Sequence, residues 1–174
     1  MTGGKIQRLL MTGLTIFWML LIFGMSGADG ESSSGMSGAV CEFIADTVIE
    51  DFDEYSLSRQ QEIISGMQFY VRKAAHMTEY AVLAILLPAT LALYGVSGRI
   101  LIWLAPLLSV LYACTDEFHQ TFVPDRSGSP VDVLIDSAGI LAGSLLYQAV
   151  RRILKNRGEK ATGEAAGKQA GTDA

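Results

Sequence analysis

Long apolar runs alternate with polar connections along the chain, and this alternation predicts four membrane-spanning helices. The runs cover residues 9–25, 80–98, 100–115 and 131–150. A helix needs about 20 mostly apolar residues to cross the hydrocarbon core of a bilayer, so the third run is short for a span. The fourth run carries Asp132 and Asp136 near its start. The pattern predicts an all-α integral membrane protein, built as a bundle of four transmembrane helices.

The first run has a second interpretation as a signal peptide. A basic start precedes its apolar stretch, and the small residues Ser26, Gly27 and Ala28 follow it, as at a cleavage site. The three later runs favour a retained anchor over a cleaved peptide, but the sequence leaves both interpretations open.

Positive charge lies at both ends of the chain and predicts the orientation of the bundle. Lys5 and Arg8 flank the first run. The last run is followed by Arg151, Arg152, Lys155, Arg157 and Lys160. Because Lys and Arg are retained on the cytoplasmic side, we expect both termini in the cytoplasm, as four spans require. The connections at residues 27–70 and 116–130 would then face outward.

The long outer connection contains two kinds of sequence. Residues 27–38 are rich in Gly and Ser, which predicts a loop. Apolar residues then recur at helical spacing with acids between them, at Val40, Phe43, Ile44, Val48 and Phe52. This pattern predicts an extracytoplasmic amphipathic helix against the membrane surface or the bundle. Residues 156–174 carry no large apolar side chain, so we expect a disordered cytoplasmic tail after a membrane domain at residues 1–155.

The composition narrows the protein class. Half of the 174 residues are hydrophobic, only 18% are charged and the net charge is −5, whereas about a quarter of a soluble domain is charged. No basic face with interleaved aromatic residues is present, so nucleic acid is not an expected partner. The two cysteines, Cys41 and Cys114, do not form a disulfide framework and are interpreted as ordinary apolar residues.

The first polar cluster lies just before the second predicted span. Arg72, His76 and Glu79 are spaced i, i+4, i+7 and share one helix face, with Lys73 and Tyr80 beside it. An ionisable stripe that enters a membrane is costly unless it faces protein or water. The stripe is therefore expected to face the bundle.

Two further clusters occupy the ends of the third and fourth predicted spans. The second cluster comprises Asp116, Glu117, His119, Gln120 and, beyond Pro124, Arg126. The third comprises Asp132 and Asp136, with Gly139 and Gly143 continuing the same face. A GxxxG spacing lets two helix backbones approach closely, so the aspartates should point at a neighbouring helix. The expected topology brings all three clusters to the outer side, where they would form a polar pocket.

Three interpretations of this pocket remain open. In the first, its charges pair with one another and only hold the helices together. In the second, Arg72, Lys73 and Arg126 bind an anionic lipid headgroup, and His76, His119 or Asp116 are candidate catalytic residues. In the third, a divalent metal is bound. Its candidate ligands are His76, Glu79, Asp116, His119, Asp132 and Asp136.

No established cofactor or catalytic signature accompanies the clusters. The sequence has no P-loop, HExxH, GxSxG or GxGxxG motif. No cofactor is therefore predicted, and whether the protein is an enzyme stays open.

The same clusters carry a resemblance to the VanZ-like family. The stretch RKAAHMTEYAVL at residues 72–83 resembles the family signature RKxxHFxEYxxL. The stretch DEFHQTFVPDR at residues 116–126 resembles its DExxQxFxPxR segment, and residues 132–143 resemble its final helix. Met77 replaces a frequent Phe and Asp125 a frequent Gly, and neither affects the polar positions. The three motifs occur in the family's order across roughly residues 10–150.

The resemblance implies a bacterial envelope protein in the cytoplasmic membrane. The family is named for a protein associated with resistance to glycopeptide antibiotics, chiefly teicoplanin. We expect this chain to bind a lipid-linked cell-wall precursor or a related anionic ligand at the outer pocket. The alternatives are a membrane-embedded hydrolase or transferase acting on a polyprenyl-phosphate lipid, and a structural or assembly protein.

Overall fold

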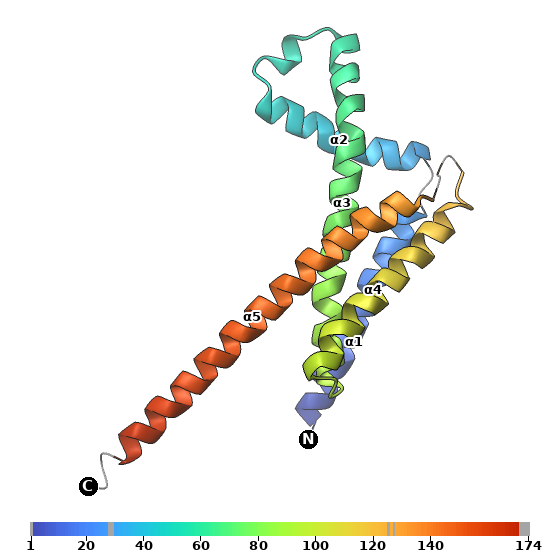
Figure 1. Cartoon of the computed structure of the whole chain (residues 1–174). Coiled ribbons are helices and arrows are strands. Elements are labelled where there is room, and N and C mark those ends of the chain that lie inside the picture. The colour runs from blue at the N-terminus through green and yellow to red at the C-terminus, as the bar shows by residue number, and fades with distance from the viewer. Residues whose placement is uncertain (1, 28–29, 125, 127, 171–174) are drawn as a thin grey trace.

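The computed structural model describes residues 2–27, 30–124, 126 and 128–170, and contains no strand within them. Its elements, in chain order, are α1 (Thr2–Ser26), α2 (Gly30–Val48), η1 (Phe52–Glu54), α3 (Leu57–Leu93), α4 (Gly98–Gln120) and α5 (Pro130–Ala170) (Figure 1). Helices α1, α3, α4 and α5 are each long and apolar enough to cross a membrane. The all-helical, four-span prediction is confirmed, and the chain is a multi-pass integral membrane protein.

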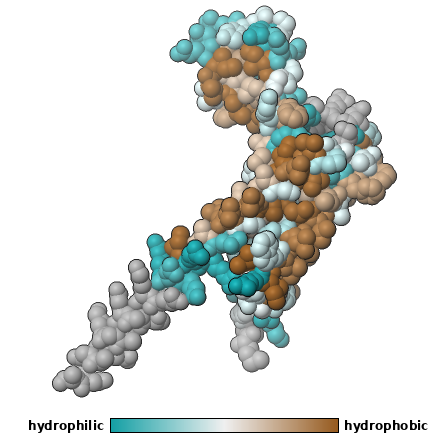
Figure 2. Space-filling model, viewed as in Figure 1, coloured by the Kyte–Doolittle hydropathy of each residue, from teal (hydrophilic) through white to brown (hydrophobic). Residues whose placement is uncertain are grey.

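The four spans pack around a small shared core. Figure 1 shows α1 and α4 beside the C-terminal half of α3, while α5 crosses α3 diagonally. The core takes residues from every span, namely Ile22, Tyr80, Leu83, Ala84, Ala113 and Ile140. Outside this core, many large apolar side chains are exposed, among them Phe17, Trp103 and Leu141. Figure 2 shows broad hydrophobic surface along the spans, which would be unstable in water but suits contact with lipid.

The glycine spacing on α5 produces the tightest helix contact. A Cβ atom at Gly139 would overlap the backbone carbonyl of Met77, and one at Gly143 would overlap that of Ala81. The two backbones therefore touch directly, as the GxxxG spacing predicted. The contact also turns Asp136, 1% exposed, into the bundle.

The helices extend beyond the apolar runs from which they were predicted. Helix α3 begins at Leu57 rather than at residue 80, because a helix can continue outside the hydrocarbon core. It ends at Leu93 rather than at residue 98, since Gly95 adopts a positive φ of 92°, a conformation open to glycine. Helix α4 continues past residue 115 to Gln120, because its polar last turns are buried in the bundle.

The Gly/Ser-rich segment is helical, and the expectation of a loop over residues 27–38 is wrong for residues 30–38. Small side chains at Ser37, Cys41 and Ala45, spaced i, i+4, i+8, are buried where α2 packs against α3. Tertiary packing of this small-residue face outweighs the low helix propensity of Gly and Ser. The predicted amphipathic helix exists, but its larger apolar residues, such as Phe43 and Val48, are exposed.

The C-terminal segment also differs from expectation. Residues 156–170 continue α5 as helix, although disorder was expected there. The segment is rich in Ala, Lys and Glu, which are strong helix formers and extend a helix already started by the span.

The bundle has two distinct ends. One, called here the site end, contains the C-termini of α1 and α4, the N-terminus of α5 and the middle of α3. The other, called the basic end, contains the N-termini of α1 and α4 and the C-terminus of α3, together with Arg151 on α5. At the basic end the Arg8 guanidinium lies over the Tyr94 ring, 5.7 Å from its centroid, which joins α1 to the end of α3.

Candidate functional site

The three polar clusters meet at the site end of the bundle. The Lys73 ammonium on α3 lies 2.6 Å from a carboxylate oxygen of Asp132 on α5. The Glu117 carboxylate on α4 accepts a hydrogen bond from the Ser129 amide at 2.9 Å, one residue before α5. Charges from separate sequence motifs thus connect the three helices directly.

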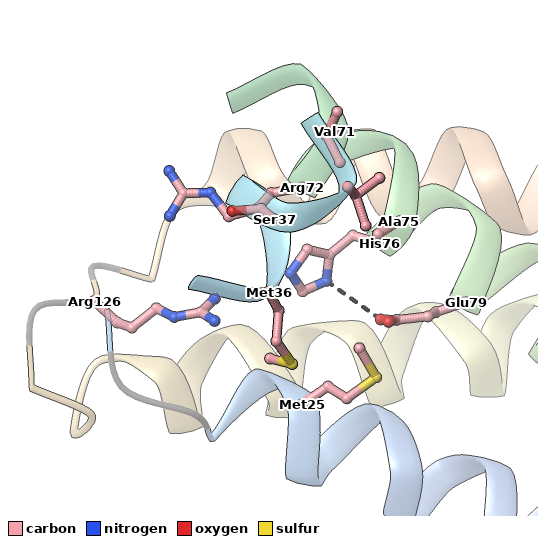
Figure 3. Close-up of a pocket in the computed structure, with 10 residues that line it drawn as sticks. Met25, Met36, Ser37, Val71, Arg72, Ala75, His76, Glu79 and Arg126 are labelled. Atoms are coloured by element: carbon pink, nitrogen blue, oxygen red, sulfur yellow. Dashed lines mark ion pairs between the residues drawn. The ribbon is translucent and has the colours of Figure 1, made fainter. Parts of the chain in front are cut away.

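A cavity of about 140 Å³ opens among these residues (Figure 3). Its polar wall consists of Arg72, His76, Glu79 and Arg126. Its other lining residues are Met25, Met36, Ser37, Val40, Val71 and Ala75. A cationic and acidic wall therefore faces a wall that is mostly apolar and rich in methionine.

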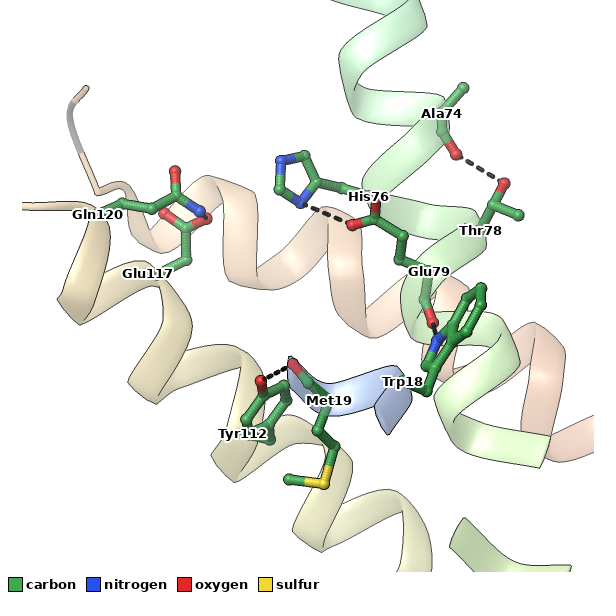
Figure 4. Close-up of polar contacts among 9 residues, drawn as sticks. All are labelled: Trp18, Met19, Ala74, His76, Thr78, Glu79, Tyr112, Glu117 and Gln120. Carbon is green, nitrogen blue, oxygen red and sulfur yellow. Dashed lines mark hydrogen bonds and ion pairs between the residues drawn. The ribbon is translucent and has the colours of Figure 1, made fainter. Parts of the chain in front are cut away.

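His76 and Glu79 form the centre of the polar wall. They sit one helical turn apart on α3, with His76 Nδ1 3.7 Å from a Glu79 carboxylate oxygen (Figure 4). Both side chains are largely buried, with 17% and 11% of their surfaces exposed. The Trp18 indole N–H donates to the Glu79 backbone carbonyl at 2.9 Å, so α1 fixes the position of this turn of α3.

Arg126 reaches the cavity from the turn between α4 and α5. Figure 3 shows its guanidinium directed toward the cavity from the opposite side to α3. Burial lowers the pKa of Arg126, and the nearby Arg72 charge lowers it further, whereas neighbouring carboxylates raise it. Because a guanidinium keeps its proton in proteins, Arg126 still presents a cation to the cavity.

A fully buried layer of oxygen-bearing side chains lies behind the polar wall. Ser26, Tyr80, Asp116 and Asp136, from four different helices, are each at most 1% exposed. Asp116 lies near the polar side chains of Ser26, Tyr80 and Gln120. Yet within the described residues neither of its carboxylate oxygens completes a hydrogen bond of normal geometry. Ionisable groups at such positions are costly and usually have a functional reason.

Glu117 positions the turn that carries Arg126. One carboxylate oxygen accepts a hydrogen bond from the Gln120 side-chain amide at 3.0 Å (Figure 4). The other accepts one from the Ser129 backbone amide at 2.9 Å. A Cβ atom at Gly128 would overlap the Glu117 carbonyl, so the turn packs directly on the last turns of α4. Although Glu117 and Gln120 were expected to bind ligand, both are buried and absent from the cavity lining.

The structure separates the three candidate catalytic residues. Of His76, His119 and Asp116, only His76 lines the cavity. The His119 ring stacks on Phe23 of α1, with 4.2 Å between ring centroids, and Asp116 belongs to the buried layer. Lys73, Tyr80, Asp132 and Asp136 likewise surround the cavity without lining it.

The candidate metal ligands do not gather into a metal site. Across the described part of the chain, no three His, Cys, Asp or Glu residues are arranged to hold a metal ion. The geometry therefore gives no support to the metal interpretation of the pocket.

Sequence reasoning missed the contributions of α1 and α2. Four residues of these helices line the cavity, namely Met25, Met36, Ser37 and Val40. Met25 lies at a span end, Met36 and Ser37 lie in the segment expected to be a loop, and Val40 belongs to the predicted amphipathic helix, which was not expected to contribute to the pocket. Cys41 is buried behind them. Burial raises the pKa of its thiol, and the Arg72 charge opposes this only in part. The sequence feature that could have indicated the contribution of α2 is the regular spacing of small residues along it. That spacing becomes informative only when the packing partner of α2, helix α3, is known.

Comparison with known proteins gives one finding about ancestry. The family model described as VanZ/LLP1 matches residues 11–152, a stretch that contains most of each of the four spans and every residue of the cavity. Neither the curated proteins nor the solved structures gave a match to this chain.

Proposed function

The chain belongs to the VanZ/LLP1 family, and from this premise we propose that it binds a lipid-linked cell-wall precursor or a related anionic lipid. The binding site is the site-end cavity, which opens on the extracytoplasmic side of the membrane. In this orientation both termini, and the basic end of the bundle, lie in the cytoplasm, as the positive-inside rule favours.

The observation that carries this proposal is the two-sided chemistry of the cavity. Arg72 and Arg126 supply two guanidinium groups, each able to hold phosphate by paired hydrogen bonds, and His76 lies between them and Glu79. The opposite wall presents Met25 and Met36, whose flexible side chains fit irregular hydrocarbon. A phosphate attached to an isoprenoid chain matches both walls at once.

Glycopeptide resistance would follow from this binding. A protein that holds a cell-wall precursor on the outer face changes the amount of precursor accessible to an antibiotic that acts there. We expect cells that express the wild-type chain to survive teicoplanin better than cells that express a protein with Arg72→Gln and His76→Ala.

Thermal unfolding of the detergent-purified protein tests the proposal. A polyprenyl phosphate should raise the Tm of the wild type, because a ligand selective for the folded state stabilises it by mass action. The shift should vanish in Arg72→Gln and in His76→Ala, but persist in Arg59→Gln, an exposed arginine on the same helix. A polyprenol without phosphate should give no shift. Equal shifts in wild type and Arg72→Gln would contradict the proposal.

A membrane-embedded enzyme is the second candidate, favoured by the His76–Glu79 pair on the cavity wall. A histidine beside a carboxylate can transfer protons at neutral pH, which would suit a hydrolase or transferase acting on a polyprenyl-phosphate lipid. Incubation with such lipids and mass spectrometry of the products decides between the two. Saturable binding without any product supports the binding protein over the enzyme.

A structural or assembly role is the third candidate. The Lys73–Asp132 ion pair and the Glu117 hydrogen bonds favour it, because both hold helices together. In that case substitutions in the cavity should lower stability and resistance in parallel, and no lipid phosphate should raise the Tm.

A further inference from the structure

A groove at the basic end lies far along the bundle from the site described above. It runs between the first turns of α4 and the part of α5 where its apolar stretch ends, and has a volume of about 500 Å³. Its lining residues are Gly98, Ile102, Leu145, Gln148, Ala149, Arg151, Arg152 and Lys155. None of the described residues that line it is acidic.

The polar side of the groove is suited to a phosphate. Arg151, Arg152 and Lys155 cover one wall, and arginine holds phosphate by paired hydrogen bonds while lysine acts as a point charge. Helix α4 starts at Gly98 on the facing wall, and the Ser97 side chain makes no capping hydrogen bond there. The first amides of a 23-residue helix therefore add partial positive charge to the same groove.

The apolar side of the groove continues toward the interior of the membrane. Ile102, Leu145 and Ala149 form its floor. Ile102, Gln148 and Arg151 also line a narrow cavity of about 20 Å³. The other residues of that cavity are Pro88, Leu101, Ala105, Pro106, Ser144 and Tyr147. An apolar path thus leads from the cationic mouth to the proline-containing turns of α3 and α4.

We propose that this groove binds an anionic phospholipid of the adjoining leaflet. Its phosphate contacts Arg151, Arg152 and Lys155, and its acyl chains lie over Ile102 and Leu145. Basic residues after a span set its orientation without any groove. This groove offers more than basic residues, because it is recessed, has a helix N-terminus facing the cations and has an apolar floor. These features together match a lipid headgroup joined to hydrocarbon. Figure 2 shows hydrophilic surface where α5 leaves the bundle, directly below the hydrophobic surface.

Native mass spectrometry of the full-length protein tests the proposal. The protein is released from nanodiscs of phosphatidylglycerol and phosphatidylcholine in equal amounts, and retained lipids are counted. The wild type should retain phosphatidylglycerol selectively. Combined Arg151→Gln, Arg152→Gln and Lys155→Gln should lower this retention about tenfold. Ala149→Trp should lower it to a similar degree with every charge intact, because the indole would fill the groove.

Matched variants distinguish a specific lipid-binding groove from general electrostatic attraction between basic residues and anionic lipid. Leu141→Trp, on the same helix outside the groove lining, and Lys5→Gln with Arg8→Gln, at the same end, should both retain the lipid. The proposal is overturned if Ala149→Trp retains phosphatidylglycerol, or if the Lys5 and Arg8 variant loses it as strongly as the groove variants. Equal competition by inorganic phosphate would also overturn it, since the acyl chains would then contribute nothing. Arg72→Gln should leave retention unchanged, which distinguishes this groove from the site-end cavity.

Discussion

The two ends of the bundle handle polar residues in opposite ways. At the site end, charged side chains are buried or partly buried, and some join the helices to one another, as the partly buried Lys73 and Asp132 do. At the basic end, charged side chains such as Arg151 and Arg152 are exposed, and the helices are joined by neutral hydroxyl groups and by the contact of Arg8 with Tyr94. The Thr15 and Thr90 hydroxyls lie 2.8 Å apart, and those of Thr12 and Tyr94 lie 3.0 Å apart.

The difference between the two ends distinguishes polar residues that only hold helices together from polar residues that have another role. A membrane helix pair can be joined by neutral hydroxyl groups at little cost, and long cations can extend to the interface. The contacts between helices at the basic end use neutral hydroxyl groups and the exposed Arg8 guanidinium, so they show what joining the helices requires. The buried carboxylates of the site end exceed that requirement, because each must be desolvated and partnered. Their presence is best explained by a task other than holding helices together.

The strongest test removes the close approach that buries the site-end charges. Gly139→Ala places a Cβ atom against the Met77 carbonyl, where backbone cannot move aside, and should cost about 3 kcal/mol of stability. Gly13→Ala, toward the basic end, meets no atom within 4 Å and should be neutral or slightly stabilising. Thermal unfolding in detergent measures both. Equal Tm values would show that α3 and α5 do not pack as closely as described.

A smaller effect is expected when Glu117 is removed. Glu117→Ala leaves the partly buried Ser129 amide without its acceptor, which should cost about 2 kcal/mol. The matched control is Glu62→Ala, whose carboxylate pairs with Arg59 on the exposed surface and should change stability by no more than about 0.5 kcal/mol. Chemical denaturation of the three proteins gives the comparison. A loss for Glu62→Ala as large as that for Glu117→Ala would erase the distinction between buried and exposed acids.

The Lys73–Asp132 pair should show a moderate coupling energy. Both side chains are about one-fifth exposed, so their interaction should lie between that of a surface pair and a buried pair, on the order of 1 kcal/mol. A double-mutant cycle of Lys73→Met and Asp132→Asn measures it. If the stability losses of the two single variants add up to the loss of the double variant, the ion pair contributes nothing to the stability of the site end.

The weakest expected effect belongs to the basic end. Thr15→Val removes the hydroxyl that meets Thr90 and should cost only about 0.6 kcal/mol, the average for such contacts in membranes. Thr78→Val is the control, because the Thr78 hydroxyl donates to the Ala74 carbonyl within its own helix. If Thr15→Val lowered the stability more than Glu117→Ala does, the hydroxyl contacts of the basic end would be stronger than the buried polar contacts of the site end.

Hydropathy and helical spacing were sufficient to predict the spans and much of the polar clustering. The run from Leu9 and the stripe of Arg72, His76 and Glu79 are local patterns, and a helix converts them directly into a span and a face. The depth shared by the three clusters followed from topology alone. The carbonyl contacts of Gly139 and Gly143 followed from their spacing.

The remaining features depend on contacts between distant segments. The helical state of residues 30–38 arises from packing on α3, which a Gly/Ser-rich sequence does not reveal. Spacing placed His119 on the same side as Asp116, but the nearest ring, Phe23, belongs to another helix and draws the imidazole away from the cavity. The apolar cavity wall was missed for the same reason, since Met25 and Met36 reach it from two different helices, α1 and α2.

The length of α3 relates the cavity to the thickness of the membrane. Its 37 residues extend about 55 Å at 1.5 Å per residue, whereas the hydrocarbon core measures about 30 Å. His76 lies about 26 Å along this helix from Leu93, so the cavity opens near the boundary between acyl chains and headgroups. A thicker bilayer would submerge this opening in hydrocarbon, and a thinner one would raise it into water. The acyl-chain length of the host membrane therefore sets whether a ligand enters sideways from the leaflet or from solution.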